Sequence, residues 1–380
     1  MEMTLRWYGS GYDTVTLEQI RQIPGVSGVI TTLYGTRPGE AWPEADIHRL
    51  IREVEASGLH VAGIESVNVH DAIKAGLPQR DQYIENYITT LERLGKAGIH
   101  MVCYNFMPVF DWTRTELARR RPDGSTVLAY TQAAVDALVP ERMFESISGD
   151  MNGTVMPGWE PERMAGIKAL FEIYRDVDEE KLFENLKYFL ECIMPVCDQY
   201  DIHMAIHPDD PAWSVFGLPR IIVNKKNILR MMKMVDNPHN GVTFCSGSYG
   251  TNLENDLPDM IRALKGRIHF AHVRNLKFHS QDDFEEAAHL SSDGDFDMYE
   301  IMKALYEIGF DGPIRPDHGR MIWGEKAMPG YGLYDRALGA AYLNGLWEAI
   351  DKTHRKTGIK ENGDRMASQS AVKVGGEDKK

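Results

Sequence analysis

The sequence predicts an α/β protein folded as a single (β/α)8 barrel, and three observations favour this fold class. Eight short apolar runs rich in β-forming residues recur from one end of the chain to the other. Segments with the apolar spacing of a helix separate them, and several of these segments close with a glycine. No glycine-rich phosphate-binding motif follows the first run, which weakens the competing interpretation, an open doubly wound sheet.

The eight runs are apolar throughout rather than alternating, as strands covered by helices should be. They span Thr4–Tyr8, Gly28–Leu33, Val61–Val67, His100–Phe106, His203–His207, Val242–Cys245, Ile268–Val273 and Ile314–Asp317. Right-handed crossovers place all helices on one side of a parallel sheet, and the sheet then curves until its edge strands pair. Eight such strands are therefore expected to close into a barrel.

The segments between the runs place apolar residues three and four positions apart, which predicts helices with one buried face. The clearest cases are Ile47, Leu50, Ile51 and Val54; Tyr83, Tyr87, Leu91 and Leu94; and Met298, Ile301, Met302 and Leu305. A glycine, which can end a helix in a left-handed conformation, precedes several of the next strands. These glycines are Gly58, Gly98, Gly266 and Gly309.

Two departures from a minimal barrel are expected. Residues from about 107 to 176, after the fourth strand, are too many and too rich in Pro, Gly, Arg and Trp for one loop and its helix. We therefore expect an insertion that roofs the carboxyl end of the barrel, where barrel enzymes carry their active sites. Residues 356–380 are polar and lack aromatics, which predicts a disordered tail and a single barrel domain over 1–355.

The amino-acid composition limits the kinds of molecule that the protein is expected to bind. With 56 acidic and 42 basic residues the net charge is −14, so we expect no binding to nucleic acid or to anionic membranes. The first residues lack the basic start and long apolar run of a signal peptide, which predicts a cytoplasmic protein. The four cysteines, Cys103, Cys192, Cys197 and Cys245, form no CxxC pair, so neither disulfides nor a zinc knuckle is indicated.

Four consecutive strands end in residues that can bind a metal ion. These are His207, Cys245, His272 and Asp317. Each alone has an ordinary structural interpretation as a hydrogen-bonded histidine, a small buried hydrophobe or a helix cap. Together, at equivalent places on adjacent strands, they should converge on one point of a closed barrel. Two imidazoles, a thiolate and a carboxylate suit Mn²⁺, Fe²⁺, Co²⁺, Ni²⁺ or Zn²⁺ better than Mg²⁺ or Ca²⁺.

Other polar residues fall near strand ends. Trp7, Tyr8, Asn105 and Arg274 could provide an aromatic floor, an amide and a guanidinium for an anionic, hydroxyl-rich small molecule, or serve only the structure. His203 and His269 come early in their strands and so belong to the end of the barrel opposite the expected active site.

Three motifs resemble the mannonate dehydratase family of hexuronate and glucuronate breakdown. They are LRWYG at 5–9, RPDHGRMIW at 315–323 and PGYGLYDRALG at 329–339, and the similarity extends to about residue 350. The resemblance implies a xylose-isomerase-like barrel that dehydrates D-mannonate to 2-keto-3-deoxy-D-gluconate with Mn²⁺ or Fe²⁺. It also implies His207, Cys245, His272 and Asp317 as metal ligands, and a homodimer or larger homo-oligomer.

The dehydration implied by the resemblance needs an acid and a base, because a C2 proton and a C3 hydroxide must both leave. His318, beside a predicted metal ligand, and Tyr331 are the expected pair, with Tyr334 as a competing choice. Arg315 or Arg274 is expected to share the developing negative charge.

Three alternatives to this function remain. A sugar isomerase or epimerase of the same barrel type would also abstract a proton beside a metal-bound oxygen. A non-enzymatic sugar-acid-binding protein would need no acid-base pair. A barrel metallo-endonuclease is disfavoured by the net charge of −14 and by the lack of a basic stripe.

Overall fold

Eight parallel strands form a closed barrel in a computed structural model that describes residues 1–137 and 166–374, with side chains described as far as Arg355. The strands follow the order β1-β12-β9-β8-β7-β4-β3-β2 around the barrel. Their bounds are β1 Glu2–Arg6, β2 Val26–Thr31, β3 His60–Glu65, β4 Met101–Tyr104, β7 His203–Ile206, β8 Asn240–Cys245, β9 Ile268–Val273 and β12 Pro313–Pro316. Each predicted run overlaps one of these strands, so the predicted fold class is confirmed.

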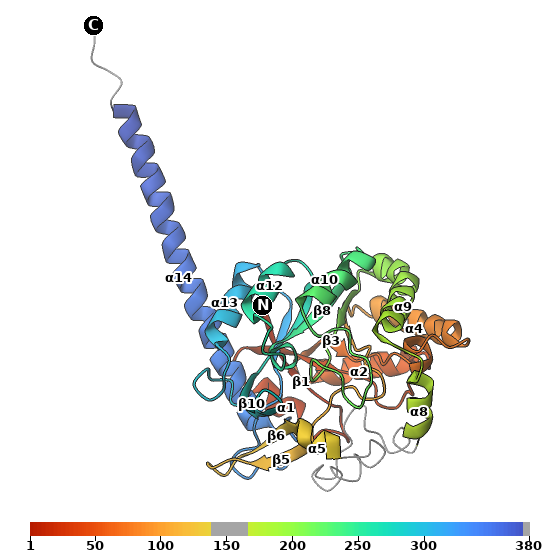
Figure 1. The fold of residues 1–380 in the computed structure, drawn as a ribbon. Helices are drawn as coiled ribbons and strands as arrows, with labels where there is room; N and C mark the ends of the chain where they lie inside the picture. The colour runs from red at the N-terminus through yellow and green to blue at the C-terminus, as the bar shows by residue number, and fades with distance from the viewer. Residues whose placement is uncertain (138–165, 375–380) are drawn as a thin grey trace.

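Helices surround the barrel (Figure 1). Their bounds are α1 Leu17–Arg21, α2 Glu44–Ala56, α3 Asp71–Lys74, α4 Arg80–Lys96, α5 Gln132–Ala137, α8 Ile167–Tyr174, α9 Glu179–Tyr200, α10 Lys225–Met234, α11 Ser246–Gly250, α12 Leu257–Ala263, α13 Met298–Glu307 and α14 Leu333–Val374. None of the helices within the described residues is long and apolar enough to cross a membrane. Within the predicted disordered tail, 356–380, the structure describes the backbone of residues 356–374 as the end of α14, and residues 375–380 lie outside the described chain.

The predicted helical spacing marks the buried faces. In α13 the side chain of Asp297 caps the first turn by accepting from the amides of Tyr299 and Glu300, and Met298, Ile301, Met302 and Leu305 are buried. α9 buries a longer stripe of apolar residues that includes Cys197, so this cysteine serves packing. The glycines expected at helix ends, Gly58, Gly98, Gly266 and Gly309, all have φ between 76° and 81°.

A second sheet of four antiparallel strands lies at the carboxyl end of the barrel (Figure 1). It joins two hairpins in the order β10-β11-β6-β5, with β5 Glu116–Arg120, β6 Thr126–Thr131, β10 Asn275–Ser280 and β11 Asp283–Ala287. The first hairpin belongs to the predicted insertion after β4, of which residues 138–165 lie outside the described chain. The second hairpin, after β9, was not predicted. Its only local signal is a Ser-Gln-Asp-Asp turn between Phe278 and Phe284.

The second sheet has its own small apolar core, separate from the main one. Tyr130, Val135, Val215, Leu276 and Phe284 form it. Phe284 is fully buried, and its ring stacks on Tyr130 at a centroid distance of 5.3 Å and meets the edge of Trp213 at 6.1 Å. This side chain therefore holds the two hairpins together.

Replacing Phe284 by alanine should loosen the second sheet more than the barrel. The large-to-small change should cost about 3–5 kcal/mol of local stability, because the cavity left between the hairpins cannot fully collapse. Hydrogen exchange of the native protein should then show faster exchange in β6, β10 and β11 than in β7 or β8. Phe278→Ala, at a half-buried position on the same sheet, is the matched control and should have a smaller effect. Equal acceleration in barrel strands would contradict the separate core.

Candidate active site

Three of the four predicted metal ligands, His207, Cys245 and His272, have ligand atoms within 4.8 Å of one another at the carboxyl end of the barrel, and Asp317 lies beside two of them. The four residues end or directly follow β7, β8, β9 and β12, which are consecutive around the barrel. His207 Nε2 lies 3.2 Å from His272 Nδ1, whereas Asp317 Oδ2 lies 3.7 Å from the same nitrogen and 3.8 Å from Cys245 Sγ. Ligand atoms that share one ion at about 2.0–2.3 Å are expected to lie about 3–4 Å apart. The spacing and the mixed donor set therefore fit a divalent transition-metal ion.

Charge within the cluster favours the ligand form of the sulfur. Burial acts to raise the pKa of the Cys245 thiol, but the Arg274 guanidinium and hydrogen bonds from His207 and His272 hold that pKa well below its usual range. Burial likewise acts against a charged His207, but the bond to Cys245 dominates and raises the pKa of His207 to about 9. The metal-free site is thus a thiolate beside an imidazolium.

Two arginines hold Asp317 as a carboxylate. Arg315 Nη1 lies 2.7 Å from Asp317 Oδ1, and Arg274 Nε lies 2.9 Å from Oδ2. Burial acts to raise the pKa of Asp317, but Arg315 above all holds it well below its ordinary value. Arg315 also reaches Glu65 Oε1 at 3.0 Å, and Glu65 Oε2 lies 3.5 Å from His272 Nε2. Arg315 therefore orients the groups around the cluster, which is how outer partners support metal ligands.

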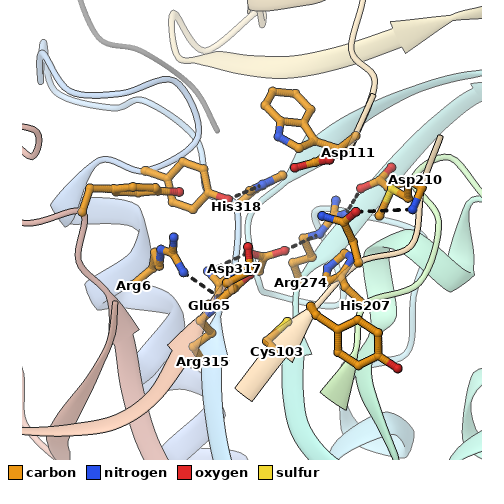
Figure 2. A pocket seen from close by; sticks show the side chains of 17 residues that line it. Arg6, Glu65, Cys103, Asp111, His207, Asp210, Arg274, Arg315, Asp317 and His318 are labelled. Carbon is orange, nitrogen blue, oxygen red and sulfur yellow. Dashed lines mark hydrogen bonds and ion pairs between the residues drawn. The ribbon is translucent and has the colours of Figure 1, made fainter. Parts of the chain in front are cut away.

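A cavity opens beside the cluster, and His207, Arg274 and Asp317 lie in its wall (Figure 2). Its empty volume, including the solvent-open mouth, is about 660 Å³. The lining is mostly polar or aromatic and includes Arg6, Tyr8, Glu65, Asn105, Asp111, Trp112, His318 and Tyr331.

His318 and Tyr331, the expected acid-base pair, form a hydrogen-bonded chain with a carboxylate. His318 Nε2 lies 2.8 Å from the Tyr331 hydroxyl, and His318 Nδ1 lies 3.0 Å from Glu286 Oε1. Glu286 belongs to β11 in the unpredicted hairpin. Burial acts to raise the pKa of Glu286, but Arg274 and His318 lower it to about 2. An ionised Glu286 accepts the proton on Nδ1 and leaves Nε2 facing the pocket.

Burial also protects the proton of Tyr331. Burial and the nearby Asp317 carboxylate outweigh Arg315 and raise the pKa of Tyr331 to about 12. The phenol is therefore protonated at neutral pH and can act as a proton donor.

Two of the remaining predicted residues, Asn105 and Arg274, line the pocket. Asn105 lines the pocket and accepts a hydrogen bond from Lys74 Nζ at 3.2 Å. Arg274 also lines it, but its guanidinium is engaged by three carboxylates rather than free for a ligand.

Two predicted residues lie outside the pocket. Trp7 is 3% exposed and packs in the main core. Successive side chains of an extended segment alternate sides, and here Arg6 and Tyr8 face the pocket, so Trp7 points away from it. Tyr334 is 41% exposed and lies beside Trp323 on the surface, with ring centroids 5.6 Å apart. Neither position supports the ligand-contacting role expected from the sequence.

Several residues of the site were not predicted. Glu286, Asp210 and Arg114 form the charged wall behind His318, and Arg6 lines the cavity from β1. Arg6 Nη1 lies 3.3 Å from Glu65 Oε2, and Arg6 Nη2 lies 3.4 Å from the Tyr34 hydroxyl. Arg6 was detectable from sequence as a basic residue at a strand end, whereas Glu286 and Arg114 are brought in from the two hairpins.

Known proteins share this chain's sequence and architecture. The model of the D-mannonate dehydratase (UxuA) family matches residues 1–357. A mannonate dehydratase of Brachyspira hyodysenteriae is 66% identical over 352 residues, 93% of this chain and 99% of its own length. The crystal structure of mannonate dehydratase from Streptococcus suis serotype 2 has a TM-score of 0.84 and 45% identity, covering 93% of this chain and 96% of that chain. A xylose isomerase domain protein of Planctomyces limnophilus shares the fold alone, with a TM-score of 0.55 and 13% identity, covering 92% of this chain and 99% of that chain.

Metal uptake should release a proton from His207. Because the pKa of His207 is raised to about 9 in the metal-free protein, the imidazole is protonated at pH 7, whereas a ligand must be neutral. The apparent affinity for Mn²⁺ should therefore rise about tenfold per pH unit from about pH 7 and level off above the pKa of His207. Calorimetric titration in two buffers of different ionisation enthalpy measures the released proton. An affinity that is independent of pH over this interval would contradict the imidazolium–thiolate pair.

Proposed function

The chain belongs to the D-mannonate dehydratase family and is a hydro-lyase, and from this premise we propose how its pocket removes water from D-mannonate to give 2-keto-3-deoxy-D-gluconate. One observation carries the proposal: His207, which clusters with Cys245 and His272, and Asp317 lie in the same cavity wall as the His318–Tyr331 pair. An activating cation and a proton-transfer pair are the two components that this dehydration needs.

We propose Mn²⁺ or Fe²⁺ as the cofactor, held by His207, Cys245, His272 and Asp317. The ligand atoms of His207, Cys245 and His272 lie within 4.8 Å of one another, and Asp317 Oδ2 lies 3.7 Å from His272 Nδ1 and 3.8 Å from Cys245 Sγ, which supports a shared ion. When bound, such an ion supplies a Lewis acid that stabilises negative charge on the substrate's carboxylate and C2 oxygen.

Arg6 is the group that we propose to bind the anionic end of the substrate. Its side chain is buried at the pocket wall, and its Nε has no hydrogen-bond partner among the described residues. Its contacts with Glu65 and Tyr34 are 3.3 and 3.4 Å long, so its guanidinium retains capacity to donate. Asn105, also in the wall, is placed to contact a hydroxyl group.

His318 and Tyr331 divide the proton transfers between them. His318 Nε2, held in the accepting tautomer by Glu286, removes the C2 proton. The C3–O bond breaks, and the Tyr331 hydroxyl gives its proton to the departing hydroxide, which leaves as water. The proton on His318 then passes to the Tyr331 oxygen across their 2.8 Å contact, which restores both groups. The enol product becomes the 2-keto acid when its C2 hydroxyl loses a proton to water and C3 gains one.

A homo-oligomer that resides in the cytoplasm is the remaining part of the proposal, and it rests on the family resemblance of the sequence. Light scattering on the purified full chain measures the subunit number directly.

Incubating anaerobically purified, Mn²⁺-loaded protein with D-mannonate tests the reaction. We expect stoichiometric appearance of the 2-keto-3-deoxy acid, followed by NMR, and loss of that activity after chelation. A product with the composition of the substrate would instead identify an isomerase or epimerase, and unchanged D-mannonate would identify a binding protein.

Tyr331→Phe tests the proposed acid. Removing the hydroxyl should lower kcat by ~10² or more while metal content stays normal, because general acid catalysis is lost and the ligand cluster is untouched. Tyr334→Phe is the matched control at the exposed tyrosine three residues on and should keep near-wild-type turnover. Near-normal kcat in Tyr331→Phe would remove this residue from the mechanism.

A further inference from the structure

Three metal-ligating side chains meet at the end of the barrel opposite the pocket. Asp201 ends α9 in a left-handed conformation, His203 begins β7, and His239 immediately precedes β8. Because β7 and β8 are neighbours, the two histidines lie at adjacent amino ends of the barrel. Ile202, between Asp201 and His203, is buried in the core, so its two neighbours point outward together. None of the three ligand-type residues takes part in the proposed dehydration.

Their ligand atoms already have the spacing of a shared ion. Asp201 Oδ1 lies 3.0 Å from His239 Nε2 and 3.4 Å from His203 Nε2. All three atoms lie within 4.8 Å of one another. Ligands bound at about 2.0–2.2 Å in a tetrahedral arrangement are expected to lie roughly 3.3–3.6 Å apart.

A second carboxylate orients one of the imidazoles. His239 Nδ1 lies 2.9 Å from Asp198 Oδ1, which also accepts from Asn237 Nδ2 at 2.8 Å. A proton on Nδ1 that is donated to Asp198 leaves Nε2 as the atom that faces Asp201. Carboxylate, imidazole and metal in that order is the usual outer support of a histidine ligand.

A third histidine packs against the other imidazole. The ring of His269 lies 4.7 Å from that of His203, and it fits only because Gly241 has no Cβ, which would collide with the His269 ring. His203 Nε2 lies 3.4 Å from Asp201 Oδ1, so the packed ring presents this nitrogen to the carboxylate.

We propose that Asp201, His203 and His239 form a second divalent-cation site, and that Zn²⁺ is the ion it takes. Two imidazole nitrogens and one carboxylate oxygen are a ligand set that Zn²⁺ binds with a fourth position left to water, and one that binds Mn²⁺ more weakly. The ion joins the end of α9 to the starts of β7 and β8 and so stabilises this face of the barrel.

Equilibrium dialysis of the metal-free full chain against Zn²⁺, followed by elemental analysis, tests the proposal. We expect two ions per subunit in the wild type. The Cys245→Ser chain, changed in the pocket cluster, should bind one ion at concentrations that saturate the second site. The His203→Gln/His239→Gln chain, changed in the second site, should also bind one. Asp198→Asn should weaken the second ion about 10- to 100-fold, as loss of an outer partner does. His60→Gln, at another histidine on the same end of the barrel, is the control and should still bind two ions.

Folding and activity distinguish loss of the second site from general damage. The His203→Gln/His239→Gln chain should keep its Mn²⁺-supported dehydration, because these side chains lie away from the pocket, and should lose only the rise in Tm that the second equivalent of Zn²⁺ produces. A wild type that binds a single Zn²⁺, or a double variant that still binds two, would overturn the proposal. Either result leaves the proposed dehydration unaffected.

Discussion

The pocket and the second sheet both depend on the ion pairs that Arg274 makes with three carboxylates. Its buried guanidinium reaches Asp210 Oδ2 at 2.6 Å, Glu286 Oε1 at 2.5 Å and Asp317 Oδ2 at 2.9 Å. Carboxylates withdrawn from water remain ionised only where a cation offsets their lost hydration. The sequence leaves room for that cation, because a Cβ at Gly247 would collide with the guanidinium. One arginine thus joins a loop after β7, a hairpin after β9 and a metal-ligand position after β12.

This network makes the chemistry depend on residues outside the barrel. Glu286 comes from β11, and Arg114, which precedes β5, lies 2.9 Å from Glu286 Oε1 and 2.7 Å from Asp210 Oδ1. Glu286 in turn selects which nitrogen of His318 faces the pocket. The barrel strands place the ligand cluster, whereas the two hairpins determine the orientation of the histidine beside it. Their joint sheet therefore supports the proposed proton-transfer histidine through Glu286.

Repetition along the chain made the barrel predictable, whereas features decided by long-range contacts were missed. Eight apolar runs specify the barrel, and barrel closure then brings His207, Cys245, His272 and Asp317 together. Trp7 and Tyr8 could not be told apart from the sequence, because strand pattern does not reveal which of two successive side chains faces the pocket; Tyr8 lines it and Trp7 does not. Tyr331 and Tyr334 lie in one loop without periodicity, so only tertiary structure separates the buried phenol from the exposed one. Glu286 was missed because nothing local links a charged hairpin to a histidine 32 residues away.

The two ends of the same strands show why a ligand cluster alone does not make an active site. β7 begins with His203, which meets His239 and Asp201, and is followed by His207, which meets His272 and Cys245. At the pocket end the partners Cys245, His272 and Asp317 are buried, so charge that develops on a substrate is stabilised in a water-poor environment. At the other end the Asp201 side chain is 72% exposed, and water screens any charge beside it. Among the described residues, the pair His318 and Tyr331 lies at the carboxyl end, whereas the proposed site at the amino end has no such pair beside it.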